Sequence, residues 1–134
     1  MMVRAVVAPS SIHGLGLFAA DRVPAGATVW RFHPMIDRTF DYRRALRELP
    51  TAAVAFLERY GHVDHERGPV LCTDDARFMN HEDKPSLVEG PAGVDLAARD
   101  LAAGDELTCD YRLFGFGLCR TFLDGPGSMR RALG

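Results

Sequence analysis

Apolar residues in the first third of the chain form short runs that glycine and proline interrupt. Three such runs occupy residues 3–8, 17–20 and 28–32. A turn is expected around Pro24 and Gly26, between the last two runs. Short β-branched and aromatic runs between turn residues are typical of strands in a small antiparallel sheet. The last third returns to this pattern, with strands expected at 86–89, 94–98 and 106–110.

The middle of the chain changes to helical spacing. Apolar residues recur every three to four positions between 41 and 49, and Pro50 ends that segment. The pattern predicts a second helix over 52–60, with Thr51 as its N-cap. Gly61 follows at the position where a left-handed residue commonly ends a helix. We therefore expect two short helices between the two β-rich parts.

A hairpin is expected after the second helix, from 61–63 and 69–72 around the polar turn 64–68. Residues 19–29 also resemble residues 97–107, since each has an aliphatic anchor, a glycine turn and a following strand. We interpret this similarity as two β-corners that pack together in one small protein. The pattern as a whole predicts a mainly β protein with short helices, an α+β fold.

Composition narrows the class of protein. The 134 residues fit one domain, and 47% of them are hydrophobic, which is enough for a buried core. The net charge of −2 gives no support to direct binding of nucleic acid. No apolar stretch approaches the roughly 20 residues of a membrane span, and the apolar start is too short for a signal peptide. Cys72, Cys109 and Cys119 are odd in number, which indicates a reducing, cytoplasmic location without disulfides.

Three separated segments combine residues that carry chemistry. The first holds Gly14-Leu15-Gly16, where glycines let the backbone approach a ligand. The second is Arg77-Phe78-Met79-Asn80-His81, followed by Pro85, and it offers amide and imidazole groups. The third runs from Gly104 to Asp110 and ends on Tyr111. Taken alone, each has an ordinary structural explanation as a turn, a satisfied polar pair or a packing tyrosine.

Together and in this order, the three segments resemble the SET-domain family of protein lysine methyltransferases. The resemblance covers roughly residues 3–117. It implies small curved sheets with a C-terminal pseudoknot, in which the end of the chain threads beneath an earlier loop. The expected domain is 1–117, with a helical insert at about 41–60 and a C-terminal tail at 118–134.

The resemblance also implies an activity and a set of functional residues. The cofactor would be S-adenosylmethionine, with S-adenosylhomocysteine as its product, and the substrate would be a protein with an exposed lysine. Tyr111 and Tyr60 would be the catalytic tyrosines, and no metal is expected. Phe114 and Phe116 would form the aromatic wall of the lysine channel, or would fill the core instead. The cofactor-binding residues would be Gly14, Leu15, Gly16, Asn80 and His81.

Two departures from the family pattern leave an alternative open. Glu82 stands where the family has a serine after the Asn-His pair, and Ser86 stands where it has an asparagine. These positions usually fix the knot loop by hydrogen bonds, so an inactive module that binds cofactor or a partner peptide is the alternative. Only Cys119 lies beyond Tyr111, so a cysteine-rich zinc module is not expected there. The tail or a second subunit, as in a homodimer, would then close the lysine channel.

A metal site is the other alternative. His62 and His65 have the spacing of a chelating pair, and Cys72 lies nearby in the sequence. The two histidines flank a polar turn, however, whereas structural zinc sites show clearer pairs of ligands. The sequence therefore favours the methyltransferase over a metalloprotein.

Overall fold

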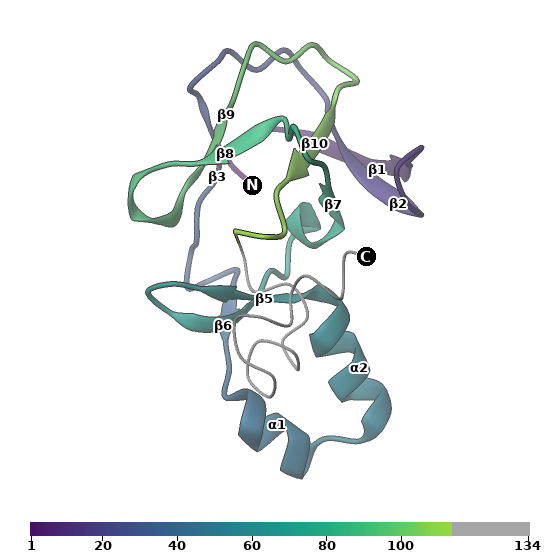
Figure 1. The fold of residues 1–134 in the computed structure, drawn as a ribbon, viewed down its shortest axis with the longest axis vertical. Helices are drawn as coiled ribbons and strands as arrows, with labels where there is room; N and C mark the ends of the chain where they lie inside the picture. The colour runs from purple at the N-terminus through teal and green to yellow at the C-terminus, as the bar shows by residue number, and fades with distance from the viewer. Residues whose placement is uncertain (114–134) are drawn as a thin grey trace.

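The computed structural model describes residues 1–113, which form three small sheets and two short helices (Figure 1). The first sheet has the order β1 (Ala5–Pro9), β2 (Leu15–Ala19), β10 (Glu106–Cys109) and β7 (Asn80–His81). The second has the order β3 (Thr28–Trp30), β9 (Asp95–Ala97) and β8 (Leu87–Glu89). The third has the order β4 (Arg38–Thr39), β6 (Gly68–Leu71) and β5 (Gly61–Asp64). This arrangement confirms the expected fold class.

The two helices are α1 (Tyr42–Glu48) and α2 (Thr51–Tyr60), and they lie beside the β5–β6 hairpin (Figure 1). Asp41 caps α1, because its carboxylate accepts a hydrogen bond from the backbone N–H of Arg44 at 3.0 Å. The predicted cap of α2 is wrong. Thr51 is already the first helical residue, and Pro50 occupies the N-cap position without a side-chain hydrogen bond.

The prediction for Gly61 is also wrong. Its φ is −77° and its ψ is 155°, which is extended backbone rather than the left-handed region. The physical reason is that β5 begins at this residue, so the chain passes directly from helix to strand. The predicted hairpin is confirmed, with β5 and β6 paired antiparallel from Gly61↔Leu71 to Asp64↔Gly68. Two short 3-10 helices, Asp75–Phe78 and Pro91–Gly93, complete the described elements.

The two similar segments, 19–29 and 97–107, pair with one another. Val23 and Leu101 exchange two backbone hydrogen bonds of 2.8 Å each. Ala19 forms two backbone hydrogen bonds with the other corner. Its N–H donates to the Asp105 carbonyl at 2.9 Å, and its carbonyl accepts from the Gly104 N–H at 2.8 Å. The interpretation as two packed β-corners is therefore confirmed, and the pairing joins the first two sheets.

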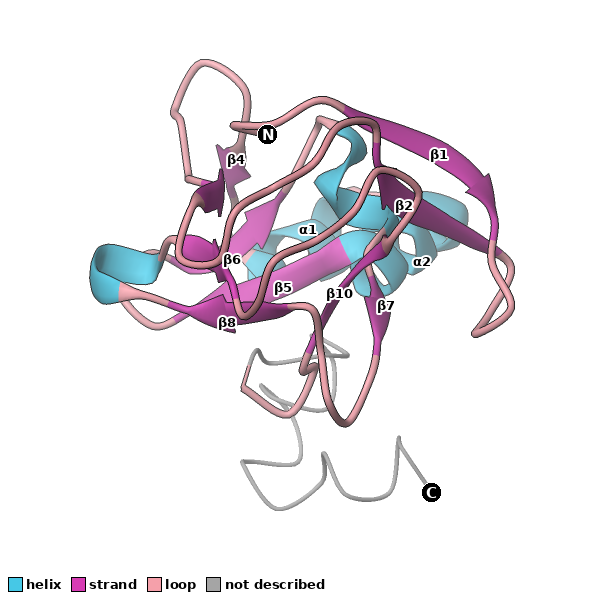
Figure 2. Ribbon diagram, turned by 90° about the horizontal axis from the view of Figure 1, so that it is seen from above, coloured by secondary structure: helices cyan, strands magenta, loops and turns pink. Residues whose placement is uncertain are grey.

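The core lies between the first and second sheets. Leu17 and Leu107 come from the first sheet and Val29 from the second, and all three side chains are fully buried. Seen from above, β10 lies between β2 and β7 (Figure 2). The last described strand is thus inserted into the middle of its sheet, and it brings the C-terminal motif beside the two earlier ones.

Several expectations fall on residues beyond 113. Phe114, Phe116 and the 118–134 tail lie outside the described residues, so their predicted roles stay predictions. Within residues 1–113, no helix has both the length and the apolar character that a bilayer crossing requires.

Candidate active site

Strand β10 brings the three sequence motifs together. On one side it pairs antiparallel with β2, which begins within the first motif, through Leu107↔Leu17. On the other side it runs parallel to β7, with Thr108 opposite Asn80 and Cys109 opposite His81. Tyr111 follows directly, at the point where β10 ends. The sheet thus assembles in one place residues that are up to about one hundred positions apart.

Asn80 holds the glycine loop through its side chain. Its Nδ2 donates to the carbonyl oxygens of His13 and Leu15 and to Oε1 of Glu106, each at 3.0 Å. The Ser10 hydroxyl lies 2.8 Å from the same Glu106 oxygen. Asn80 is only 8% exposed, so water has little access to these contacts. The Asn80 amide therefore positions the loop, and its N–H groups already donate to acceptors within the protein.

The two positions of the first motif require glycine for different structural reasons. Gly14 has a φ of +45°, a left-handed conformation that glycine adopts without strain. Gly16 has no room for a side chain, because an added Cβ would lie 2.2 Å from Oε1 of Glu106. The group that closely approaches the Gly16 backbone is thus the Glu106 carboxylate of the protein itself. Leu15, between the glycines, lines the neighbouring cleft.

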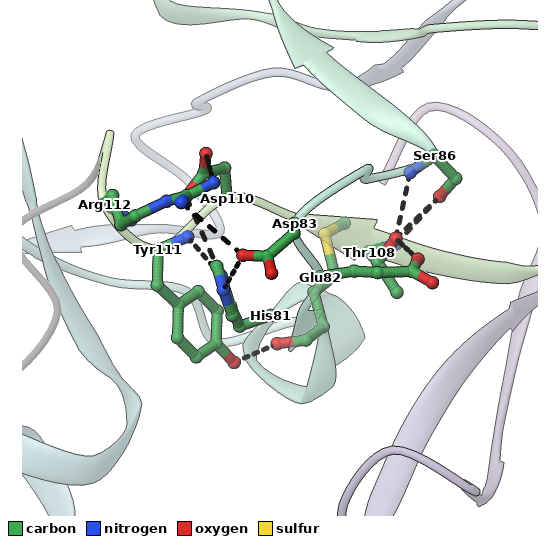
Figure 3. Close-up of polar contacts among 9 residues, drawn as sticks. His81, Glu82, Asp83, Ser86, Thr108, Asp110, Tyr111 and Arg112 are labelled. Carbon is green, nitrogen blue, oxygen red and sulfur yellow. Dashed lines mark hydrogen bonds and ion pairs between the residues drawn. The ribbon is translucent and has the colours of Figure 1, made fainter. Parts of the chain in front are cut away.

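Glu82 and Ser86, the two departures from the family pattern, both bind β10 (Figure 3). The Ser86 hydroxyl donates to the Glu106 carbonyl at 2.9 Å and accepts from Thr108 N–H at 2.8 Å. The Thr108 hydroxyl donates to Oε2 of Glu82 at 2.8 Å and accepts from Ser86 N–H at 2.9 Å. Ser86 and Thr108 are fully buried. The loop that carries Glu82 and Ser86 is therefore hydrogen-bonded to β10 through these two residues.

His81 and Tyr111 contact one another at the end of β10 (Figure 3). The backbone N–H of Tyr111 donates to Nδ1 of His81 at 3.1 Å, which leaves the ring hydrogen on Nε2, 3.3 Å from Oδ1 of Asp83. The Tyr111 hydroxyl donates to the Met79 carbonyl. Burial raises the pKa of Tyr111, so its phenol stays protonated at neutral pH.

A cleft of about 470 Å³ lies beside these residues. Its lining includes His13 and Leu15 from the first motif, Asn80 and His81 from the second, and Tyr111 from the third. Clefts of roughly 300–1,000 Å³ are typical of small-molecule and cofactor sites. Gly14 and Gly16, which were also expected at the cofactor, shape the loop without lining this cleft.

A second, smaller cavity of about 80 Å³ adjoins the cleft. Both spaces are bordered by Tyr60, Met79 and Tyr111, together with Arg59 and Arg77. The structure thus brings Tyr60 and Tyr111 to the same two spaces. The Tyr60 ring packs against Phe56 and Phe78, with ring centroids 5.1 Å and 5.9 Å away.

The small cavity also contains residues that sequence reasoning missed. Trp30 and Asp95 line it, and they face each other across β3 and β9. Burial is the main reason that the pKa of Asp95 rises to about 7. Glu106, which anchors both Asn80 and Ser10, was missed as well. A signal for Asp95 was available, since it is an acidic residue inside the otherwise apolar strand 94–98.

The two histidines of the alternative metal site contact different parts of the protein. The His62 ring lies edge-on to Trp30, with centroids 6.1 Å apart, and burial lowers its pKa. His65 Nε2 lies 3.2 Å from the carbonyl oxygen of Leu113. Over residues 1–113, no three His, Cys, Asp or Glu side chains gather in a way that could hold a metal ion.

Comparison with known proteins agrees with this geometry. The family model of the SET domain matches residues 14–112. Comparison with curated proteins gives no match. Among solved structures, a similar one is the crystal structure of a Plasmodium falciparum protein assigned as a histone methyltransferase. It is 15% identical, with a TM-score of 0.54, and the match covers 83% of this chain and 95% of that one. At this identity the likeness concerns the fold, while the match over most of the sequence shows that the chain belongs to the SET-domain family.

Proposed function

We propose that this protein transfers a methyl group from S-adenosylmethionine to the side-chain amine of a lysine on another protein. The observation that carries the proposal is the pair of adjoining cavities that share Tyr60, Met79 and Tyr111. Methyl transfer from a sulfonium is an in-line displacement, so donor and acceptor must approach one carbon from opposite sides. Two spaces of unequal size that meet at the same residues suit this requirement.

The larger cleft fits the cofactor. Its volume of about 470 Å³ lies in the range of small-molecule sites. β7 is an edge strand of its sheet, so Asn80 and His81 keep backbone groups outside the β10 ladder that can bind an adenine ring. The loop around Leu15 would hold the methionine end. When bound, the cofactor supplies an already activated methyl group, and the protein's part is to position the amine.

The smaller cavity fits the lysine. At about 80 Å³ it has room for the end of a narrow chain and not for a cofactor. The Tyr111 hydroxyl hydrogen is directed at the Met79 carbonyl, which fixes the phenol oxygen at the junction of the two spaces. From there the oxygen can orient the amine and form weak C–H···O contacts to the methyl group. Tyr60 would form the other aromatic side of the channel.

The alternative of an inactive module depended on Glu82 and Ser86. Both side chains hydrogen-bond Thr108, or the backbone beside it, at 2.8–2.9 Å. These contacts keep β10, and with it Tyr111, in place. This observation supports the active form.

Two measurements test the proposal. Isothermal calorimetry with S-adenosylhomocysteine should give micromolar-scale binding. Incubation of a lysine-containing peptide library with methyl-labelled S-adenosylmethionine should then give products heavier by one or more methyl groups on lysine. A matched library with acetyl-lysine in place of lysine is the control. Cofactor binding without labelling of any lysine would favour the inactive module, and the absence of cofactor binding would refute the proposed activity.

A further inference from the structure

The small cavity contains a hydrogen-bond donor and an acceptor that have no partner within the protein's described part. Trp30 is 4% exposed and Asp95 is 8% exposed, and both line the cavity. The indole Nε1–H of Trp30 is buried and donates to no hydrogen-bond acceptor among the described residues. Over residues 1–113, no hydrogen bond or ion pair reaches the Asp95 carboxylate either. Buried polar groups are nearly always satisfied, so two open ones beside a cavity indicate a polar ligand group.

Asp95 is the only acidic residue among the described residues that border this cavity. Four other side chains that line the cavity are held in their neutral forms by burial. Burial raises the pKa of the Cys72 and Cys109 thiols and of Tyr111, and it lowers the pKa of His62. Arg59 and Arg77 border the cavity as well, but a guanidinium cannot accept a proton. Glu89 lies opposite Asp95 on β8, and its charge adds to the rise in the Asp95 pKa.

On the basis of the proposed function, we infer that Asp95 binds the ammonium group of the incoming lysine and accepts one of its protons before methyl transfer. One N–H bond of the ammonium breaks, an O–H bond forms on the carboxylate, and the nitrogen keeps the electron pair. An ion pair thus becomes a neutral amine beside a neutral carboxylic acid. After the product leaves, Asp95 returns the proton to water.

The buried setting favours this transfer. A lysine in water has a pKa near ~10.4, but burial beside a sulfonium disfavours its charged form. Burial has the opposite effect on Asp95, whose pKa of about 7 makes it a better proton acceptor than an ordinary carboxylate. Both changes bring the two proton affinities toward each other. The Trp30 N–H can stabilise the carboxylate before transfer or a water beside it.

A binding experiment tests the inference without any methyl transfer. The full chain is labelled with ¹³C at the aspartate carboxyl groups, and the Asp95 signal is identified by its loss in Asp95→Asn. The probe is n-butylamine, which is a cation at neutral pH and mimics the end of lysine, with 1-butanol as the uncharged control. We expect n-butylammonium to lower the titration midpoint of Asp95 by at least ~1 pH unit, because a cation favours the carboxylate. 1-Butanol should not lower it.

Matched variants complete the binding test. Asp95→Asn should weaken n-butylammonium binding at least ~10-fold. Glu89→Gln removes the same charge from the neighbouring strand without altering the cavity lining, and it should retain binding. An Asp95 midpoint that n-butylammonium leaves unchanged, or equal binding by Asp95→Asn, would overturn the inference. Neither result bears on whether lysines are methylated, so the proposed function is judged separately.

A pH profile tests the proton transfer itself. With a lysine peptide from the library, Asp95→Asn should lower turnover at pH 7 at least ~100-fold, as expected for loss of a general base. The rate of the variant should keep rising with pH, because its amine must lose the proton to solvent. A thialysine peptide, whose amine is less basic, should recover more activity with Asp95→Asn than with the parent. Identical pH profiles for parent and variant would show that Asp95 accepts no proton.

Discussion

Replacing Asn80 with alanine should destabilise the protein and weaken cofactor binding together. The substitution removes the amide that joins the His13 and Leu15 carbonyls to the Glu106 carboxylate. One amide has two hydrogens, which here serve three acceptors. A neutral hydrogen bond contributes about 1 kcal/mol and one to a charged group about 2 kcal/mol. The free energy of unfolding should therefore fall by about 3 kcal/mol, and the melting temperature by roughly 10 °C.

The same change should loosen the loop that lines the cleft to which we assign the cofactor. His13 and Leu15 border the cleft, and the Asn80 amide fixes both of their carbonyls. We expect the affinity for S-adenosylhomocysteine to fall at least ~10-fold, because binding must then order the loop. Urea unfolding followed by circular dichroism gives the stability, and calorimetry gives the affinity.

Ser11→Ala is the matched control, since Ser11 lies on the same loop and is exposed. It should change the free energy of unfolding by less than about 0.5 kcal/mol. If Asn80→Ala were as stable as Ser11→Ala, the three contacts would contribute nothing. If it were unstable but bound the cofactor normally, the loop would not form part of the cofactor site.

Three further predictions follow from the same structure. Tyr111→Phe should lower turnover at least ~100-fold while cofactor affinity is retained, because in the proposed function the hydroxyl acts in the transition state; a parallel loss of both, measured by kinetics and calorimetry, would make Tyr111 a packing residue. The pKa of Asp95 is about 7 in the folded protein, above its ordinary value in the unfolded chain, so the parent should lose stability as pH rises from about 4 through about 7. Urea titrations at pH 5 and pH 8 should show Asp95→Asn flattening this dependence, with a gain of at most about 4 kcal/mol at pH 8; an unchanged dependence would place the titration elsewhere. Gly16→Ala places a Cβ 2.2 Å from Oε1 of Glu106 and should cost about 1–3 kcal/mol by thermal unfolding, whereas a neutral effect would mean that this carboxylate moves away freely.

The sequence determined the elements and the family. The spacing of apolar residues between 41 and 60 predicted both helices, and the β5–β6 hairpin and the paired corners were also predicted correctly. These features depend on turn residues and periodicity within a few positions, so a local pattern can reveal them. The caps at Thr51 and Gly61 were predicted wrongly, because the strand that follows α2 overrides the usual chemistry of a helix end.

Only the tertiary structure decided what the individual site residues do. Asn80 was predicted to bind the cofactor, and the structure adds that its side-chain amide donates to carbonyls 65 and 67 positions earlier. Ser86 departs from the sequence pattern of the family, yet it exchanges buried hydrogen bonds with Thr108, 22 positions later. Asp95 lines the cavity that Tyr60 and Tyr111 border because strand β9 passes beside it. A hydrogen-bond partner and a burial environment are set by which strands become neighbours, and the insertion of β10 between β2 and β7 creates neighbours that no local pattern contains.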